Sequence, residues 1–77
     1  ATSVKYRIPS RANVTLNIYD TEGRLVASLV NGVKKAGWHE TAWNGTGRSG
    51  NNVSSGIYFC RLQAGKTEIS RKMVLLR

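Results

Sequence analysis

Several residue types that small proteins use for cross-linking or catalysis are scarce in this chain. Its 77 residues include one cysteine, one histidine, one proline and four acidic residues. A single Cys60 cannot close an internal disulfide, and with His39 alone it cannot complete a tetrahedral zinc site. No stretch approaches the roughly 20 apolar residues of a membrane helix. We therefore expect no metal site and no cofactor.

The chain does contain enough apolar residues to fold. Hydrophobic residues make up 40% of it and include two tryptophans, three tyrosines and one phenylalanine, which is too many for a disordered segment. The length allows one small domain, 1–77. Because the sequence lacks an initiator methionine and opens directly in a strand-like pattern, we expect it to be a module excised from a larger protein.

Short alternating segments separated by turn residues dominate the pattern. In 2–8 and again in 14–19 every second residue is apolar, which is the period of a strand with one buried face. About seven such strands, at intervals of about 8 to 12 residues, are typical of an antiparallel β-sandwich. We therefore predict an all-β domain with strands near 2–8, 14–19, 24–30, 38–43, 57–63 and 67–76.

The segment 24–30 is the ambiguous one. Leu25, Val26, Leu29 and Val30 fit the i, i+4 spacing of a helix as well as a strand that is apolar on both faces. The segment is short, and turn signals at Glu22-Gly23 and at Asn31-Gly32 bound it. These boundaries favour a strand that ends at the Asn-Gly pair.

The residues that could carry out catalysis have more ordinary interpretations. Asp20 and Glu22 share one turn, where carboxylates more often cap or solvate than catalyse. His39 lies in the middle of a strand segment, which favours a packed or hydrogen-bonded role over that of a general base. Cys60 is also in mid-strand, with no neighbour that would lower its pKa, so we expect an inert thiol. We predict no catalytic residue.

Glycine spacing and net charge suggest nucleotide or nucleic-acid binding only superficially. Gly45, Gly47 and Gly50 match the outline of the dinucleotide fingerprint, but no helix follows them. The net charge of +8 comes from twelve lysines and arginines scattered through every segment. This dispersal favours solvated faces over a nucleic-acid interface, so no nucleic acid is expected. We keep an anionic cell-surface glycan or lipopolysaccharide as an alternative binding partner.

Trp38 is the most conspicuous outward residue. Alternation sets it opposite Trp43, so that Trp38 faces solvent if Trp43 is in the core. An exposed tryptophan can stack on a sugar ring, with Tyr19 as a second aromatic contact, or it can pack against a neighbouring domain. We favour packing and keep carbohydrate binding as an alternative.

The order of motifs resembles a known family. The run VTLNIYDTEGRLVASLVNG, at 14–32, resembles the signature V-x-L-x-I-Y-D-x-x-G-R-x-V-x-x-L-V of bacterial FlgD-like immunoglobulin-like domains. These domains include the C-terminal sorting domains (type A) of the type IX secretion system. Nearly the whole chain takes part, through further matches at 35–37, 39, 43–45, 50, 55–59, 61–65 and 71–77.

The motif residues make sense as parts of a scaffold. We expect Asp20 to bond turn amides and Gly23 to supply the unusual dihedral of the turn. Trp43 would fill the core before an Asn-Gly turn at Gly45, and Gly56 would lead tightly into the next strand. Asn44 stands where the family usually has Asp, so a loop cation site is not expected.

The resemblance implies a non-catalytic sorting or anchoring module. Such a domain would be recognised by the protein secretion machinery. It would form the C-terminal part of a larger secreted or cell-surface protein, such as a hydrolase exported through the periplasm of a Gram-negative bacterium. The segment Arg71, Lys72, Met73 and Val74, on an edge strand, is our candidate for receptor recognition, although it could equally just complete the sandwich. Alternatives are an auxiliary carbohydrate-binding module, a spacer packed on the upstream domain, or a flagellar hook-cap domain.

Overall fold

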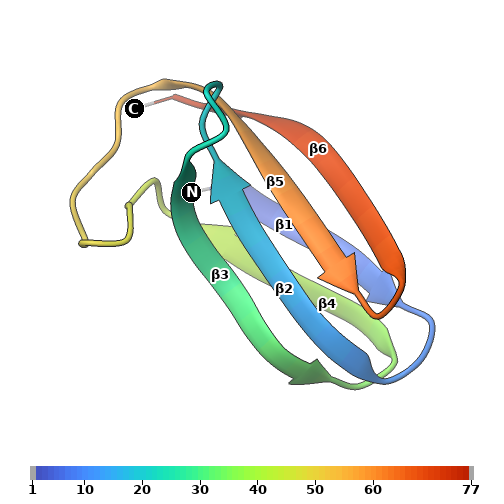
Figure 1. Ribbon diagram of the computed structural model, residues 1–77. Helices are drawn as coiled ribbons and strands as arrows, with labels where there is room; N and C mark the ends of the chain where they lie inside the picture. The colour runs from blue at the N-terminus through green and yellow to red at the C-terminus, as the bar shows by residue number, and fades with distance from the viewer. Residues whose placement is uncertain (1, 77) are drawn as a thin grey trace.

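The computed structural model describes residues 2–76 and consists of six strands in two antiparallel sheets (Figure 1). One sheet has two strands in the order β1-β4, and the other has four in the order β3-β2-β5-β6. This confirms the predicted all-β sandwich, with six strands against the expected number of about seven. The strands are β1 (Thr2–Ile8), β2 (Ala12–Tyr19), β3 (Leu25–Lys34), β4 (Gly37–Trp43), β5 (Gly56–Ala64) and β6 (Thr67–Leu75).

The alternation of each strand buries one face between the two sheets. Val14, Leu16 and Ile18 of β2 are completely buried, with Ile8 of β1 and Trp43 of β4 almost so. The intervening residues face solvent, as the period of two requires. No charged or polar side chain is buried in this core among residues 2–76. The same residues include no helix that could cross a membrane.

From Leu25 on, the ambiguous segment 24–30 forms part of strand β3, and two irregularities in this strand interrupt its alternation of apolar and polar residues. The register between β2 and β3 shifts between Leu16 and Asn17 and again between Ile18 and Tyr19, so that Leu29 and Val26 have no direct partner on β2. An extra residue of this kind is a β-bulge and breaks the alternation of apolar residues. Both unpaired side chains pack against the core. The bulges therefore explain the helix-like spacing.

The predicted turn at Asn31-Gly32 is wrong. Both residues lie inside β3, where Asn31 pairs with Thr15 and Gly32 pairs with Val14. Because β2 continues opposite them, ladder hydrogen bonds override the local turn preference. The chain turns later, just before Gly37, whose φ of 122° lies in the region that favours glycine.

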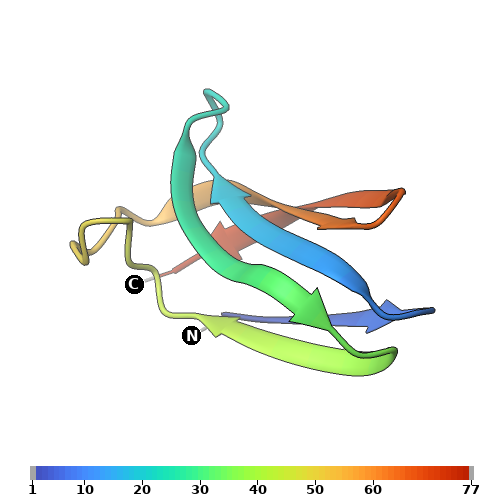
Figure 2. The same cartoon turned by 60° about the horizontal axis from the view of Figure 1, so that its bottom comes forward.

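The two sheets are closed on one side only. In Figure 2 the four-stranded sheet arches over β1 and β4, with β3 approaching β4 on one side. On the other side two hollows, lined mainly by residues of β1, β5 and β6, open between the sheets. The domain therefore has a closed side at β3–β4 and an open side at β1–β6.

Candidate docking surfaces

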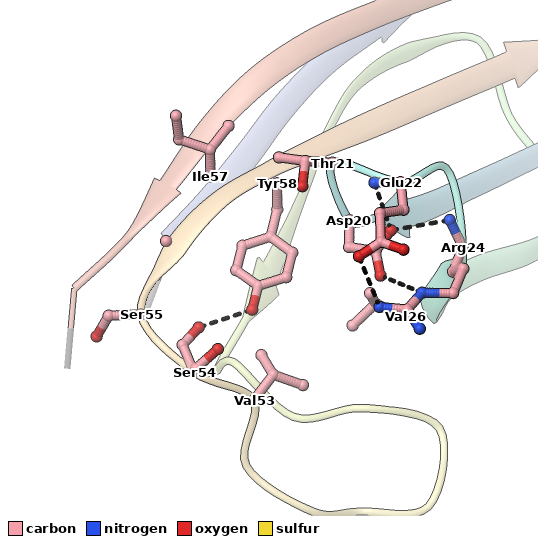
Figure 3. A pocket seen from close by; sticks show the side chains of 11 residues that line it. Asp20, Thr21, Glu22, Arg24, Val26, Val53, Ser54, Ser55, Ile57 and Tyr58 are labelled. Carbon is pink, nitrogen blue, oxygen red and sulfur yellow. Dashed lines mark hydrogen bonds and ion pairs between the residues drawn. The ribbon is translucent and has the colours of Figure 1, made fainter.

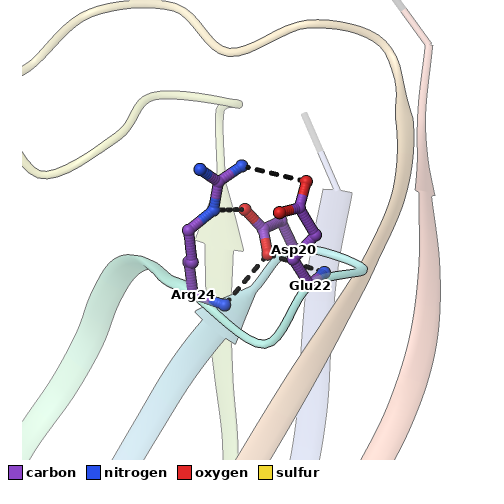
Figure 4. Close-up of polar contacts among 3 residues, drawn as sticks. All are labelled: Asp20, Glu22 and Arg24. Atoms are coloured by element: carbon purple, nitrogen blue, oxygen red, sulfur yellow. Dashed lines mark hydrogen bonds and ion pairs between the residues drawn. The ribbon is translucent and has the colours of Figure 1, made fainter.

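The β2–β3 turn is held by its aspartate. Asp20 Oδ1 accepts hydrogen bonds from the amides of Glu22 and Arg24, both at 2.9 Å (Figure 4). Arg24 Nε donates to Asp20 Oδ2 at 2.9 Å, and its guanidinium also reaches Glu22 Oε1 at 3.3 Å. The amide of Arg24, helped by its guanidinium, holds the pKa of Asp20 below the usual value. Gly23 has a φ of 82°, which suits this turn.

A cleft of about 350 Å³ lies between this turn and the segment that enters β5 (Figure 3). Its acids, Asp20 and Glu22, are paired with Arg24, and a carboxyl with a lowered pKa is a poor proton donor near neutral pH. Tyr58, which points into it, donates its hydroxyl to the Ser54 carbonyl at 2.7 Å. No histidine or lysine among the described residues lines the cleft to activate a serine hydroxyl. The polar side chains of the cleft thus stabilise the turn and the entry to β5, and they are not arranged for acid–base catalysis.

The other reactive side chains are held in packing contacts. The His39 ring stacks on Tyr6 with centroids 5.5 Å apart, and its Nε2–H donates to the Lys35 carbonyl at 2.8 Å. Cys60 is buried, and this burial raises the pKa of its thiol, which disfavours the reactive thiolate. In 2–76 no group of three or more His, Cys, Asp or Glu side chains could hold a metal ion.

The remaining predicted scaffold residues lie between β4 and β5. Trp43 is only 2% exposed, meets Tyr58 edge-on at 5.1 Å and donates its indole N–H to the Thr46 carbonyl at 2.9 Å. Gly45 has a φ of 80°, and its carbonyl accepts the amide of Val53. Gly56 begins β5 with a φ of 155°.

The two candidate aromatic contacts, Trp38 and Tyr19, do not form one site. Trp38 is 65% exposed on the outer face of the two-stranded sheet, where Lys5 Nζ lies 5.4 Å from its ring centroid. Tyr19 follows the buried Ile18 on β2 and therefore lies on the outer face of the four-stranded sheet. The two outer faces point in opposite directions, so a single sugar cannot stack on both rings.

The predicted recognition segment divides between two faces of β6. Met73 is buried in the core, so its side chain is not accessible to a receptor in the folded domain. Lys72 and Val74 are exposed on the outer face of the four-stranded sheet. Arg71 is on the inner face, opposite Cys60, where it lines the hollows beside β1.

Strand pairing joins Lys72 and Val74 to Tyr19 in one surface. Tyr19 pairs with Leu25 and with Phe59, Phe59 pairs with Lys72, and the neighbouring Val74 pairs with Ile57. Paired strands lie about 4.8 Å apart, so these side chains are contiguous. Leu25, Ile57, Phe59 and Val74 are between 38% and 53% exposed. We name this surface, formed by Tyr19, Leu25, Ile57, Phe59, Lys72 and Val74, the outer patch.

The sequence interpretation missed three members of the outer patch. Ile57 and Phe59 alternate with the buried Tyr58 and Cys60, so their outward direction was available from the sequence. The outward direction of Leu25 could not be predicted from alternation, because the bulge at Val26 changes which residues of β3 face outward.

Comparison with known proteins identifies the domain type. The model of the FlgD Ig-like domain matches residues 1–68. The chain belongs to the FlgD Ig-like domain family. It is also similar to the crystal structure of FlgD from P. aeruginosa, with a TM-score of 0.74 and 26% identity over 94% of this chain. The chain spans 55% of that protein's chain. No curated protein is significantly similar to it.

Membership of the FlgD Ig-like family confirms the immunoglobulin-like part of the resemblance. It agrees with the packing of His39 and Cys60, because this is a non-catalytic domain type. The family match ends at residue 68, so that Arg71, Lys72 and Val74 lie beyond it, on the last strand.

Proposed function

We propose that this FlgD Ig-like domain is a non-catalytic sorting or anchoring module of a larger exported protein. The observation that carries the proposal is the outer patch, with four exposed apolar side chains and a tyrosine gathered on one sheet face. Contiguous exposed apolar surface in a small soluble domain is typical of a docking site. In this role the patch contacts a receptor of the secretion machinery, and the parent protein, a hydrolase, reaches the cell surface through the periplasm.

The edge of β6 adds a second means of recognition beside the patch. β6 is the last strand of its sheet, so one side of its backbone has no neighbouring strand. A receptor strand could pair with this edge while Lys72 and Val74 contact its side chains. Lys72 makes no ion pair within residues 2–76, whereas Arg61 on the same face is paired with Glu68 at 2.7 Å. Lys72 is thus available for an acidic group of the receptor.

Surface substitutions test the proposal better than truncation. Deleting 67–77 would remove Met73 and Leu75 from the core, and the loss of folding would itself block export. We therefore change Phe59→Glu and Val74→Asp in the full-length parent protein. The matched control is Val33→Asp, because Val33 is 58% exposed on β3 at the other end of the sheet.

We expect the patch variant to accumulate inside the cell, with a several-fold loss from the medium and the cell surface, while the control is exported normally. Circular dichroism and thermal unfolding of the purified domains establish that both variants fold. Equal export of a folded patch variant and the control would refute the sorting role.

The similarity to FlgD from P. aeruginosa favours a second candidate, assembly in a flagellar hook cap. In that case the patch docks on another flagellar protein, and deletion of the parent gene abolishes flagella without affecting secreted hydrolases. Motility and electron microscopy of the deletion strain separate the two candidates. A carbohydrate-binding role has less support because Trp38 and Tyr19 lie on opposite faces. Anionic lipopolysaccharide remains a proposed partner through the scattered cations.

A further inference from the structure

A second surface, separate from the outer patch, lies on the open side of the sandwich. Two hollows of about 220 and 210 Å³ share the side chains of Val4, Lys5, Cys60 and Arg71. Because the two hollows share these residues and both lie along β1, we treat them together and name them the edge groove. It is lined by β1 from Thr2 to Arg7, by Trp38, and by residues of β5 and β6.

The floor of the edge groove is apolar and incompletely covered. Cys60 and Leu62 reach it from β5 and are nearly buried. Ile69 pairs with Leu62 and therefore shares its inward direction, yet it is 40% exposed. An inward aliphatic side chain stays exposed only where no strand of the opposite sheet covers it. The four-stranded sheet thus extends beyond the two-stranded sheet that faces it.

The wall of the groove is the backbone edge of β1. β1 pairs with β4 alone, through all seven of its residues from Thr2 to Ile8. Alternate amides and carbonyls on its other side therefore have no ladder partner. An added strand here would be the third of this sheet and would lie directly over Ile69 and Leu62. Backbone pairing with β1 and side-chain packing on Ile69 and Leu62 would together fix the position of the added strand.

Charge indicates what kind of strand fits. Lys5, Arg7 and Arg71 line the groove, Lys72 joins them at one end, and neither hollow is lined by an aspartate or glutamate. Within residues 2–76 none of these four cations forms an ion pair. Lys5 and Arg7 are on the outer face of β1, whereas Arg71 is on the inner face of β6. Outward acidic side chains of an added strand would therefore stand beside Lys5 and Arg7.

We propose that the edge groove binds an extended segment of a partner protein in which apolar and acidic residues alternate. The segment pairs with β1, its apolar side chains cover Ile69 and Leu62, and its acidic side chains face Lys5 and Arg7. Strand addition of this type obtains affinity from main-chain hydrogen bonds and specificity from alternate side chains. The proposal does not depend on the outer patch or on the sorting role.

The test uses the 77-residue chain and a fluorescein-labelled peptide of about nine residues that alternates glutamate with valine, a length that spans β1. We expect saturable binding by fluorescence anisotropy, with amide chemical-shift changes along Thr2–Ile8. A lysine-for-glutamate peptide should bind at least about tenfold more weakly, because it meets like charges. A peptide N-methylated at every second residue should also bind about tenfold more weakly, since it cannot complete the ladder.

Matched variants locate the site. Ile69→Lys should weaken binding about tenfold by filling the groove with a charge, and Val33→Lys, at an exposed aliphatic outside it, should have no effect. Should Ile69→Lys unfold, Arg71→Glu against Lys66→Glu gives the same comparison from exposed positions. The outer-patch variant Val74→Asp should bind the peptide normally, which separates this result from the outcome of the export experiment.

Three outcomes would overturn the proposal. Equal binding of the N-methylated peptide would mean that charge alone attracts it. Binding of lipopolysaccharide at the groove without binding of the glutamate–valine peptide would identify an anionic surface as the occupant. A dimer in sedimentation velocity that Ile69→Lys dissociates would identify a second copy of the chain as the occupant.

Discussion

The substitution Trp43→Phe should destabilise the domain far more than the same substitution at Trp38. Trp43 is 2% exposed, its indole N–H donates to the Thr46 carbonyl at 2.9 Å, and its ring contacts Tyr58 edge-on. Phenylalanine keeps an aromatic ring against Tyr58. It removes the donor and leaves part of the space empty.

The magnitude follows from these two losses. Two buried ring carbons are worth about 0.8 kcal/mol each. The hydrogen bond adds about 1 kcal/mol, and not more, because the half-exposed Thr46 can still bond water. The sum is about 2.5 kcal/mol, a large part of the roughly 4 to 12 kcal/mol expected for 77 residues. A loss of this size lowers the melting temperature by roughly 10 to 20 °C.

The assay is urea unfolding followed by far-ultraviolet circular dichroism, since fluorescence changes with tryptophan content. Trp38→Phe is the control: Trp38 is 65% exposed and contacts Lys5, so its loss should change the free energy of unfolding by less than about 0.5 kcal/mol. Similar losses for both variants, or a larger loss for Trp38→Phe, would refute the assignment of Trp43 to the core and of Trp38 to the surface.

Three further predictions concern single residues. Cys60, buried with a raised pKa, should react with a thiol reagent at about pH 8 only after unfolding; stoichiometric labelling of the native domain within seconds would contradict this. Gly23→Ala should cost about 1 kcal/mol in urea unfolding because Gly23 has a φ of 82°, whereas Gly32→Ala, without positive φ and with open space at its Cβ, should cost nothing measurable. The lowered pKa of Asp20 means that its stabilisation is complete above the usual value of 3.8 and is lost as pH falls through the lower folded-state pKa. Asp20→Asn should therefore flatten the acid side of the stability profile, and an unchanged profile would show that the turn carboxylate is not responsible.

Most of the fold could be predicted because the strands that bury one face carry the signal in their own residues. The segment 2–8 was predicted with its observed limits, because Val4, Tyr6 and Ile8 alternate with residues that face solvent. The prediction failed where the limits of a strand depend on its pairing with another strand. The end of β3 depends on β2 continuing opposite Asn31-Gly32, and local turn preference contains no information about that partner.

The candidate site was harder to predict because it consists of residues from different strands. The recognition segment was treated as contiguous, yet adjacent strand residues point to opposite faces, so Met73 is in the core while Val74 is exposed. The pairing of Tyr19 and Trp38 failed for a related reason. Each residue was correctly placed outward on its own strand, but nothing in either segment shows that β2 and β4 belong to opposite sheets.

The arrangement of the sheets accounts for both docking surfaces. A two-stranded sheet cannot cover a four-stranded one, so the inner face of β6 is exposed at Ile69. On the closed side β3 and β4 are in contact. On the outer face, by contrast, the patch exists because Tyr19 and Phe59 pair across strands whose inward residues already fill the core. Burying Tyr19 and Phe59 as well would require another layer, which neither of the two sheets provides. The two proposals therefore assign different occupants to the two surfaces: a receptor surface to the outer patch and an extended strand to the edge groove.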